Sequence, residues 1–277
     1  MAKKILIITF LFILSIACAY YNARFVNTKQ FKIREEILSD EKINDKADGF
    51  LIAYFCDLSL NDFLQEEYLD SIFSTLTDFK PEVILFGGDL IDFDNIPNQD
   101  RIDALKERLS SLSASYGKYA VLGDQDHRNE EEMLHLFEEC GFKVLNNETA
   151  LICIDPQTYI NITGIDALIN GNSEPSQAFQ LVNSTYYTIV FSHCPDLFDS
   201  LLSYNFDYFL SGHSRGGQVY LPLLSLFDRA YGCRKYFRRK TTKENVTIDI
   251  SNGLGRIEKD ARFLADAEIV LYRLSSQ

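Results

Sequence analysis

Apolar residues recur along this chain in patterns that separate expected helices from expected strands. The chain opens with a run from Ile5 to Tyr21 that contains no charged residue and is mostly apolar. Farther on, apolar residues spaced three and four apart predict amphipathic helices, and short continuous apolar runs predict buried strands. The helices expected on this basis cover 65–79, 100–113 and 130–140.

The expected strands are shorter and are spread over the rest of the body. They cover 50–56, 83–86, 118–122, 142–146, 149–154, 158–164, 187–192, 206–210, 217–221, 246–251 and 267–274. Strands and helices alternate in the first half, and strands dominate the second half. This order favours a single α/β domain built around sheets, because each apolar sheet face must be covered by another layer.

The N-terminal run is expected to be a targeting segment and not part of the fold. Its length is at the short end of what a helix needs to cross a bilayer, and Ala17-Cys18-Ala19 has the small-x-small pattern of a signal cleavage site. Residues 1–24 are therefore expected to be either a membrane anchor or a cleaved signal. Lys3 and Lys4 favour a cytoplasmic N-terminus.

That orientation places the body on the extracytoplasmic face of a membrane, or outside the cell if the signal is cleaved. Residues 25–48 are charged and polar and are expected to form a polar stalk or an edge segment. Residues 49–277 are then expected to form the domain.

The charge balance of the chain disfavours nucleic acid as a partner. It carries 27 basic and 40 acidic residues, a formal net charge of −13, which repels phosphate backbones. One basic stretch interrupts the acidic body, and it is either a solvated loop or a patch that faces phosphate or a membrane. Its residues are Arg229, Arg234, Lys235, Arg238, Arg239, Lys240 and Lys243.

Polar residues follow several of the expected strands, where a buried strand has no need of them. They include Asp57, Asp89, Asp124, His193 and His213. Each alone is more often a turn former or a helix cap than a ligand. Ligands of α/β sheets bind beyond the carboxyl ends of strands, so these side chains are expected to meet at one site. Carboxylates and imidazoles together suit Mn, Fe or Zn.

The order of these motifs resembles that of the calcineurin-like metallophosphoesterases. Their pattern is D-x-H, G-D-x-x-D, G-N-H-D, a histidine at a strand end, and G-H-x-H. The corresponding blocks here are Asp57-Leu58-Ser59, Gly88–Asp92, Gly123–Asp126, His193 and Gly212–Arg215. The Gly216-Gly217-Gln218 segment and the apolar N-terminus resemble the membrane-associated phosphodiesterase branch. The resemblance implies a four-layer α/β/β/α sandwich with two facing sheets.

Three histidines of the family pattern are replaced, by Ser59, Gln125 and Arg215. In the family, one metal uses both members of D-x-H, the bridging aspartate and the last histidine of G-H-x-H. Only Asp57 and Asp89 remain of that set. The four ligand positions of the other metal all keep ligand-capable residues: Asp89, Asp124, His193 and His213. The resemblance therefore implies one divalent transition metal and a degenerate site for a second.

The general-acid position of the family is occupied by Gln125, and an amide cannot transfer a proton at a useful pKa. The residues left as candidates for catalytic roles are Asp126, His127 and Arg215. Arg215 is attractive because a guanidinium can donate two parallel hydrogen bonds to a phosphate.

Two functions remain open at this point. The first is a mononuclear, weakened metal-dependent phosphoesterase at the extracytoplasmic membrane surface, acting on phosphodiester or pyrophosphate groups of small molecules or lipid headgroups. The second is a catalytically inactive relative that binds a phosphorylated ligand or a protein partner without turnover.

Overall fold

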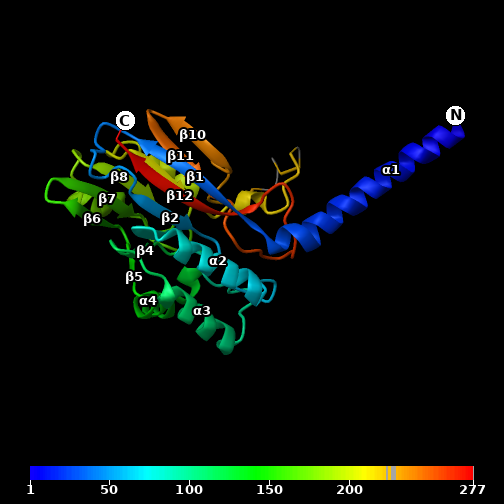
Figure 1. The fold of residues 1–277 in the computed structure, drawn as a ribbon, viewed down its shortest axis with the longest axis horizontal. Coiled ribbons are helices and arrows are strands. Elements are labelled where there is room, and N and C mark those ends of the chain that lie inside the picture. Colours follow the sequence, from blue (N-terminus) through cyan, green and yellow to red (C-terminus); the bar gives the residue numbers. More distant parts are fainter. Residues whose placement is uncertain (223, 226–228, 277) are drawn as a thin grey trace.

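A computed structural model describes residues 1–222, 224–225 and 229–276 (Figure 1). Two six-stranded sheets form its centre. The first sheet has the strand order β1 (Phe31–Ser39), β12 (Ala267–Ser275), β2 (Leu51–Phe55), β3 (Val83–Phe86), β4 (Lys118–Ala120) and β5 (Phe142–Val144). The second has the order β10 (Arg239–Lys243), β11 (Val246–Ile250), β9 (Tyr208–Ser211), β8 (Tyr187–Phe191), β7 (Thr158–Gly164) and β6 (Glu148–Asp155).

Helices cover the outer faces of both sheets. Those on the first sheet are α2 (Glu66–Phe79), α3 (Gln99–Ser111) and α4 (Glu130–Glu139) (Figure 1). The second sheet packs against the short helices α5 (Pro175–Ala178) and α6 (Phe198–Leu201). The expected four-layer α/β/β/α sandwich is therefore confirmed.

Strand β2 shows why the central strands appear in the sequence as continuous apolar runs. Its residues alternate between two buried faces, because successive side chains of a strand point in opposite directions. Ala53 and Phe55 pack toward the helices, whereas Ile52 and Tyr54 pack between the two sheets. A strand buried on both faces has no polar side chain to break the run.

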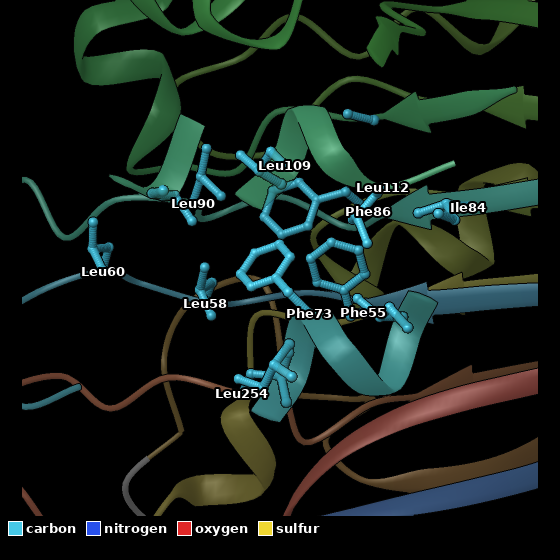
Figure 2. Close-up of a cluster of buried hydrophobic side chains, with 14 of the residues drawn as sticks. Phe55, Leu58, Leu60, Phe73, Ile84, Phe86, Leu90, Leu109, Leu112 and Leu254 are labelled. Atoms are coloured by element: carbon cyan, nitrogen blue, oxygen red, sulfur yellow. The ribbon is translucent and has the colours of Figure 1, made fainter. Parts of the chain in front are cut away.

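The core under the helices contains a group of close aromatic contacts. The ring centroids of Phe55 and Phe86, from neighbouring strands, are 5.0 Å apart. Figure 2 shows Phe73 of α2 pointing toward both rings, with Leu109 and Leu112 beside them. This packing holds α2 and α3 against the strands whose ends carry the polar motifs.

Most of the expected elements are confirmed, with ends shifted by at most two residues. The strand expected at 217–221 is wrong: Gly217 has a φ of 81°, and Val219 forms only an isolated bridge to Phe263. Strands β1 and β10 were not expected. Both are edge strands with mostly polar, exposed residues, so neither has the apolar run of a central strand.

The chain between the N-terminal helix and the domain is ordered against the body. Residues 22–29 continue α1 (Ala2–Tyr21) as further helical turns, and β1 pairs in parallel with β12 along its whole length. The structure thus places 31–39 inside the first sheet as its edge, and not in a stalk. Helix α1 itself projects from the body with no buried residue (Figure 1).

Substitution of Phe73 by alanine is expected to lower the free energy of unfolding by about 3–5 kcal/mol, because it removes a buried ring and leaves a cavity. The control is Asp78→Ala, an exposed position on the same helix, which should change stability by less than about 0.5 kcal/mol. Denaturant unfolding measures both. Equal effects of the two substitutions would contradict the packing described for α2.

Candidate metal centre

The site lies at the carboxyl ends of five strands, three from the first sheet and two from the second. Each of these strands is followed within four residues by one of the predicted ligands. The ligands are Asp57 after β2, Asp89 after β3, Asp124 after β4, His193 after β8 and His213 after β9. Because β2, β3 and β4 are parallel neighbours, as are β8 and β9, these ends meet at one edge of the sandwich.

Three of these residues, Asp124, His193 and His213, bring one atom each to a single point. Nε2 of His193 lies 3.0 Å from Oδ1 of Asp124 and 3.4 Å from Oδ2 of Asp89. Nδ1 of His213 lies 3.0 Å from the same Asp124 oxygen and 3.1 Å from Nε2 of His193. Two imidazole nitrogens and one carboxylate oxygen therefore surround one small volume, and Asp89 borders it through His193, in a second group with Asp57.

Backbone carbonyl groups orient both imidazole rings. Nδ1 of His193 donates to the carbonyl oxygen of Gly87 at 2.8 Å, and Nε2 of His213 donates to that of Tyr231 at 2.8 Å. A carbonyl can only accept, so in each ring the nitrogen facing the cluster is the one left without that proton. Metal-binding histidines are oriented by the same kind of contact.

The electrostatics of the cluster favour a positive charge at its centre. Burial opposes the charged form of His193, but the carboxylates of Asp89 and Asp124 outweigh burial and raise its pKa. Burial alone would raise the pKa of Asp124, yet the neighbouring imidazoles of His193 and His213 lower that pKa. Each group stabilises the opposite charge on its neighbours.

The donor set fits one divalent transition metal. Oδ1 of Asp124 is buried and has no hydrogen-bond donor among the described residues, although two histidine nitrogens lie 3.0 Å away. Buried carboxylate oxygens are normally hydrogen-bonded, and an oxygen so placed beside imidazole nitrogens is typical of a metal ligand. Asp89, Asp124, His193 and His213 are the residues that would hold the ion.

Arg215 occupies the other side of Asp89. Its Nη2 donates to Oδ2 of Asp89 at 2.6 Å and to Oγ of Ser59 at 2.9 Å, and lies 3.5 Å from Oδ1 of Asp57. Burial opposes the charge, but Asp57 and Asp89 outweigh it and raise the pKa of Arg215. A fixed guanidinium charge therefore sits between two buried carboxylates.

The turns that present these side chains are backbone-strained. Asp57, Ser59, Asp89, His213 and Arg215 all have positive φ, between 45° and 64°. This region is rare for residues other than glycine, and such strain, on the order of 1–3 kcal/mol each, clusters at functional sites. Five such residues around one carboxylate pair indicate a site that the fold maintains at a cost in stability.

Close approach of neighbouring turns requires glycine at two of these positions. A Cβ at Gly123 would overlap Oδ1 of Asp89, and a Cβ at Gly212 would overlap Oδ2 of Asp57. The glycines of the motifs therefore make room for the aspartates.

Asp126 lies at the site but faces the backbone. Its carboxylate accepts hydrogen bonds from the amides of Asp89, Leu90 and Gly123 at 2.8–2.9 Å. Burial, followed by the nearby Asp89, raises the pKa of Asp126 to about 7. The structure thus gives it the geometry of a positioning residue that joins two ligand-bearing turns.

The structure does not bring His127 to the cluster. Its Nε2 lies 2.7 Å from Oδ1 of Asp166 and its Nδ1 lies 3.2 Å from Oε2 of Glu130. The side chain of Gln125 is also hydrogen-bonded away from the cluster: its Oε1 accepts a hydrogen bond from Arg128 at 3.1 Å. Neither side chain contacts Asp124, His193 or His213 among the described hydrogen bonds.

Two features of the site were missed in the sequence. Asp166, the partner of His127, follows β7 as the metal ligands follow their strands, so a strand-end signal was present. The carbonyl group of Tyr231, which orients His213, gave no such signal, because every residue has a backbone carbonyl group and the sequence does not distinguish one from another.

Comparisons with known proteins show which proteins this chain resembles. No family model matches it. It is 28% identical to the metallophosphoesterase YkuE of Bacillus subtilis over 260 residues, which are 93% of this chain and 90% of that protein. It is 30% identical to the metallophosphoesterase YkoQ of the same organism over 204 residues, 71% of this chain and 72% of that protein. It is 25% identical to the UDP-2,3-diacylglucosamine pyrophosphatase LpxG of Chlamydia trachomatis, over 81% of this chain and 83% of that protein.

The His127 contacts predict a pH-dependent contribution to stability. Burial opposes the charged ring, but Asp166 outweighs it and raises the pKa of His127 above 6.5, while the pKa of Asp166 is lowered. His127→Ala should therefore lower the free energy of unfolding by about 1–3 kcal/mol near pH 5–6. The loss should shrink as the pH rises above 6.5 and through the higher folded-state pKa.

Thermal unfolding from pH 5 to pH 9 measures this difference. The control is His135→Ala, because His135 is exposed and lies 3.5 Å from Glu139. A His127→Ala loss that is the same at every pH would show that the ring is held by packing and not by its charge.

Proposed function

Because the chain belongs to the calcineurin-like metallophosphoesterase family, we propose that it is a phosphoesterase that works with one divalent metal and a fixed arginine. The observation that carries this proposal is the position of Arg215. Its Nη2 lies among Asp57, Ser59 and Asp89, the positions that hold a metal in the family pattern. The guanidinium charge takes the place of an ion there.

Arg215 supplies a hydrogen-bonding cation where the family pattern has a Lewis acid. One of its nitrogens is used by Asp89 and Ser59, whereas its Nε is buried and has no partner among the described residues. Arg215 also lines a pocket beside the cluster, where its guanidinium can donate to a phosphate oxygen of the substrate. A guanidinium cannot generate hydroxide from water, so turnover is expected to be weaker than in a two-metal site.

The metal held by Asp89, Asp124, His193 and His213 would supply Lewis-acid stabilisation of charge on a phosphoryl oxygen. The chain itself positions the reacting group. The carboxylate of Asp89 contacts both His193 and Arg215, so a phosphate held at this site lies between two positive centres. Electrostatic stabilisation of this kind is often the largest contribution to catalysis.

A pocket beside the cluster is available for the rest of the substrate. It has a volume of about 370 Å³, and His213, Ser214 and Arg215 form part of its lining, with Leu221 and Phe237 farther out. Its mixed polar and apolar lining fits phosphodiester or pyrophosphate compounds that carry an apolar group, such as lipid headgroup derivatives.

The proposed location is a membrane surface. Helix α1 is long and apolar enough to cross a bilayer, with a mean hydropathy of 2.1 over its best 18-residue window and no burial against the body. A signal sequence has the same properties, so anchor and cleaved signal are both compatible with α1. The basic residues before the run favour an extracytoplasmic body.

A second candidate function is ligand binding without turnover. It is favoured by Gln125, which stands at the general-acid position and is hydrogen-bonded to Arg128. With His127 held by Asp166, no described titratable group replaces the missing proton donor. In this alternative the site binds a phosphorylated ligand or a protein partner.

The purified chain is expected to contain about one transition metal, because one complete ligand set is present. His193→Ala should lose it, whereas His135→Ala, on the exposed face of α4, should keep it. Elemental analysis after dialysis measures the content. Turnover of a chromogenic phosphodiester by the metal-loaded protein, abolished in His213→Ala, would support the hydrolase; metal binding without turnover would support the binding protein.

Restoring the family pattern should restore the second metal. The double variant Ser59→His and Arg215→His is expected to raise the metal content from about one to about two per chain, because it removes the guanidinium and adds two imidazole ligands. Arg128→His is the matched control and should leave the content at about one. A double variant that folds but still binds one metal would contradict the assignment of Arg215 to the vacant metal position.

A further inference from the structure

The base of α1 is fastened to the segment that forms one wall of the pocket. The carbonyl group of Ala23 accepts from the amide of Arg262, and Arg24 forms an ion pair with Asp260 at 2.5 Å. Arg256 donates to the carbonyl oxygen of Thr28 at 2.7 Å. Because these contacts replace a flexible linker, the direction of α1 fixes the orientation of the body.

The pocket lies at the end of the body from which α1 emerges, because it shares the 257–259 segment with the base of α1. Ile257, Glu258 and Lys259 line the pocket and belong to the fastened segment. Figure 1 shows yellow and orange loops beside the base of α1, with β6 at the opposite end of the body. A membrane crossed by α1 would therefore face the end of the body that holds the pocket.

The surface next to this pocket combines exposed apolar side chains with arginines. Leu221 and Leu224 line the pocket itself, and Arg238 and Leu264 line a neighbouring cavity. We call this set the collar: Leu221, Leu224, Tyr231 and Leu264 with Arg229, Arg234 and Arg238. The exposed fractions of Leu224, Tyr231 and Leu264 are 67%, 58% and 54%. Three or more large apolar residues exposed on one such surface are more than the scattered exposure usual on a soluble surface.

The arginines of the collar differ from the lysines of the same basic stretch. Lys235 and Lys243 pair with Asp199, and Lys240 pairs with Glu36, so the body neutralises these charges. Among the described residues, no carboxylate pairs with Arg229, Arg234 or Arg238.

The collar arginines lie on aromatic rings instead. The guanidinium of Arg238 is 3.9 Å from the ring centroid of Tyr220, and that of Arg229 is 4.8 Å from that of Phe237. Arg234 lies 5.6 Å from the ring of Tyr231. The positive charges are thus held at the surface, beside apolar side chains, in a chain whose net charge is −13.

We propose that the collar is a second membrane contact, which rests on an anionic lipid surface and holds the mouth of the pocket at the headgroups. The inference rests on the proposed membrane location of α1. Apolar side chains inserted at the headgroup boundary together with arginines are the combination that binds anionic bilayers. The pocket beside Arg215 then opens toward phosphate groups that are carried by lipids.

Single tryptophans report on this contact directly, because the chain contains no tryptophan. The full chain is reconstituted in nanodiscs of equal parts phosphatidylcholine and phosphatidylglycerol, some carrying a doxyl-labelled lipid. Leu224→Trp and Leu264→Trp place reporters in the collar. Leu151→Trp, at an exposed position of β6 with a similar exposed fraction of 53%, is the matched control.

Quenching and a blue shift of emission in both collar variants, absent in Leu151→Trp, are the expected result. Unfolding temperatures close to that of the unsubstituted chain identify the folded variants. Quenching at both collar positions is required, so that a local effect of one substitution is not taken for lipid contact. If the protein floats with the discs but neither collar reporter is quenched more than Leu151→Trp, the collar does not contact lipid. That result overturns the inference and leaves the proposed membrane location of α1 unaffected. If the protein does not float with the discs, the proposed membrane location fails, and the inference with it.

The charge component is tested in the same system. Arg229→Gln with Arg234→Gln in the Leu224→Trp background should lower the ratio of inserted to free collar by about fivefold per arginine in the anionic discs. In discs of phosphatidylcholine alone the pair should have little effect. Lys80→Gln with Lys143→Gln removes the same charge from exposed positions outside the collar and should leave quenching unchanged; an equal effect of both pairs would overturn the role of the collar arginines.

Discussion

The carboxylate of Asp89 is the group on which the rest of the site depends. It is buried, its Oδ1 accepts from the amide of Gln125 at 3.0 Å, and its Oδ2 lies between Nη2 of Arg215 and Nε2 of His193. Burial of a charge is tolerated only when it is paired. The fold therefore has to supply positive charge on both sides of this one residue, and each side does so in a different way.

On one side of Asp89 the positive charge is the permanent charge of the Arg215 guanidinium. On the other side it comes from protonated histidines or from a bound ion. This asymmetry follows from substitutions in motifs that are far apart in sequence: Ser59 and Arg215 are in contact although they lie 156 positions apart. The side of His193 and His213 keeps its ligands, and carbonyl groups hold both rings in the tautomer that a metal requires. In the proposed function, metal binding and phosphate binding therefore belong to opposite sides of one aspartate.

The sandwich makes this arrangement possible because strand ends from both sheets meet at one edge. The strained turns at Asp57, Asp89 and His213 are stabilised by the packing of the layers beneath them and by Asp126, which binds the amides of two neighbouring turns. The same edge is linked to α1 through the 256–262 segment, so the orientation of the N-terminal helix and that of the pocket are coupled.

The sequence by itself determined the central elements and predicted which polar residues meet at the strand ends, because both have a local sequence pattern. Continuous apolar runs identify strands buried on two faces, and the polar residues that follow them identify the strand ends where ligands gather. Edge strands β1 and β10 lack that pattern, since their pairing depends on β12 and β11 and not on their own composition. Only the tertiary structure decided that Arg215 lies between Asp57 and Asp89. It also decided that His127 contacts Asp166 and that the carbonyl group of Tyr231 orients His213. Each of these contacts joins segments that come together only when the chain folds.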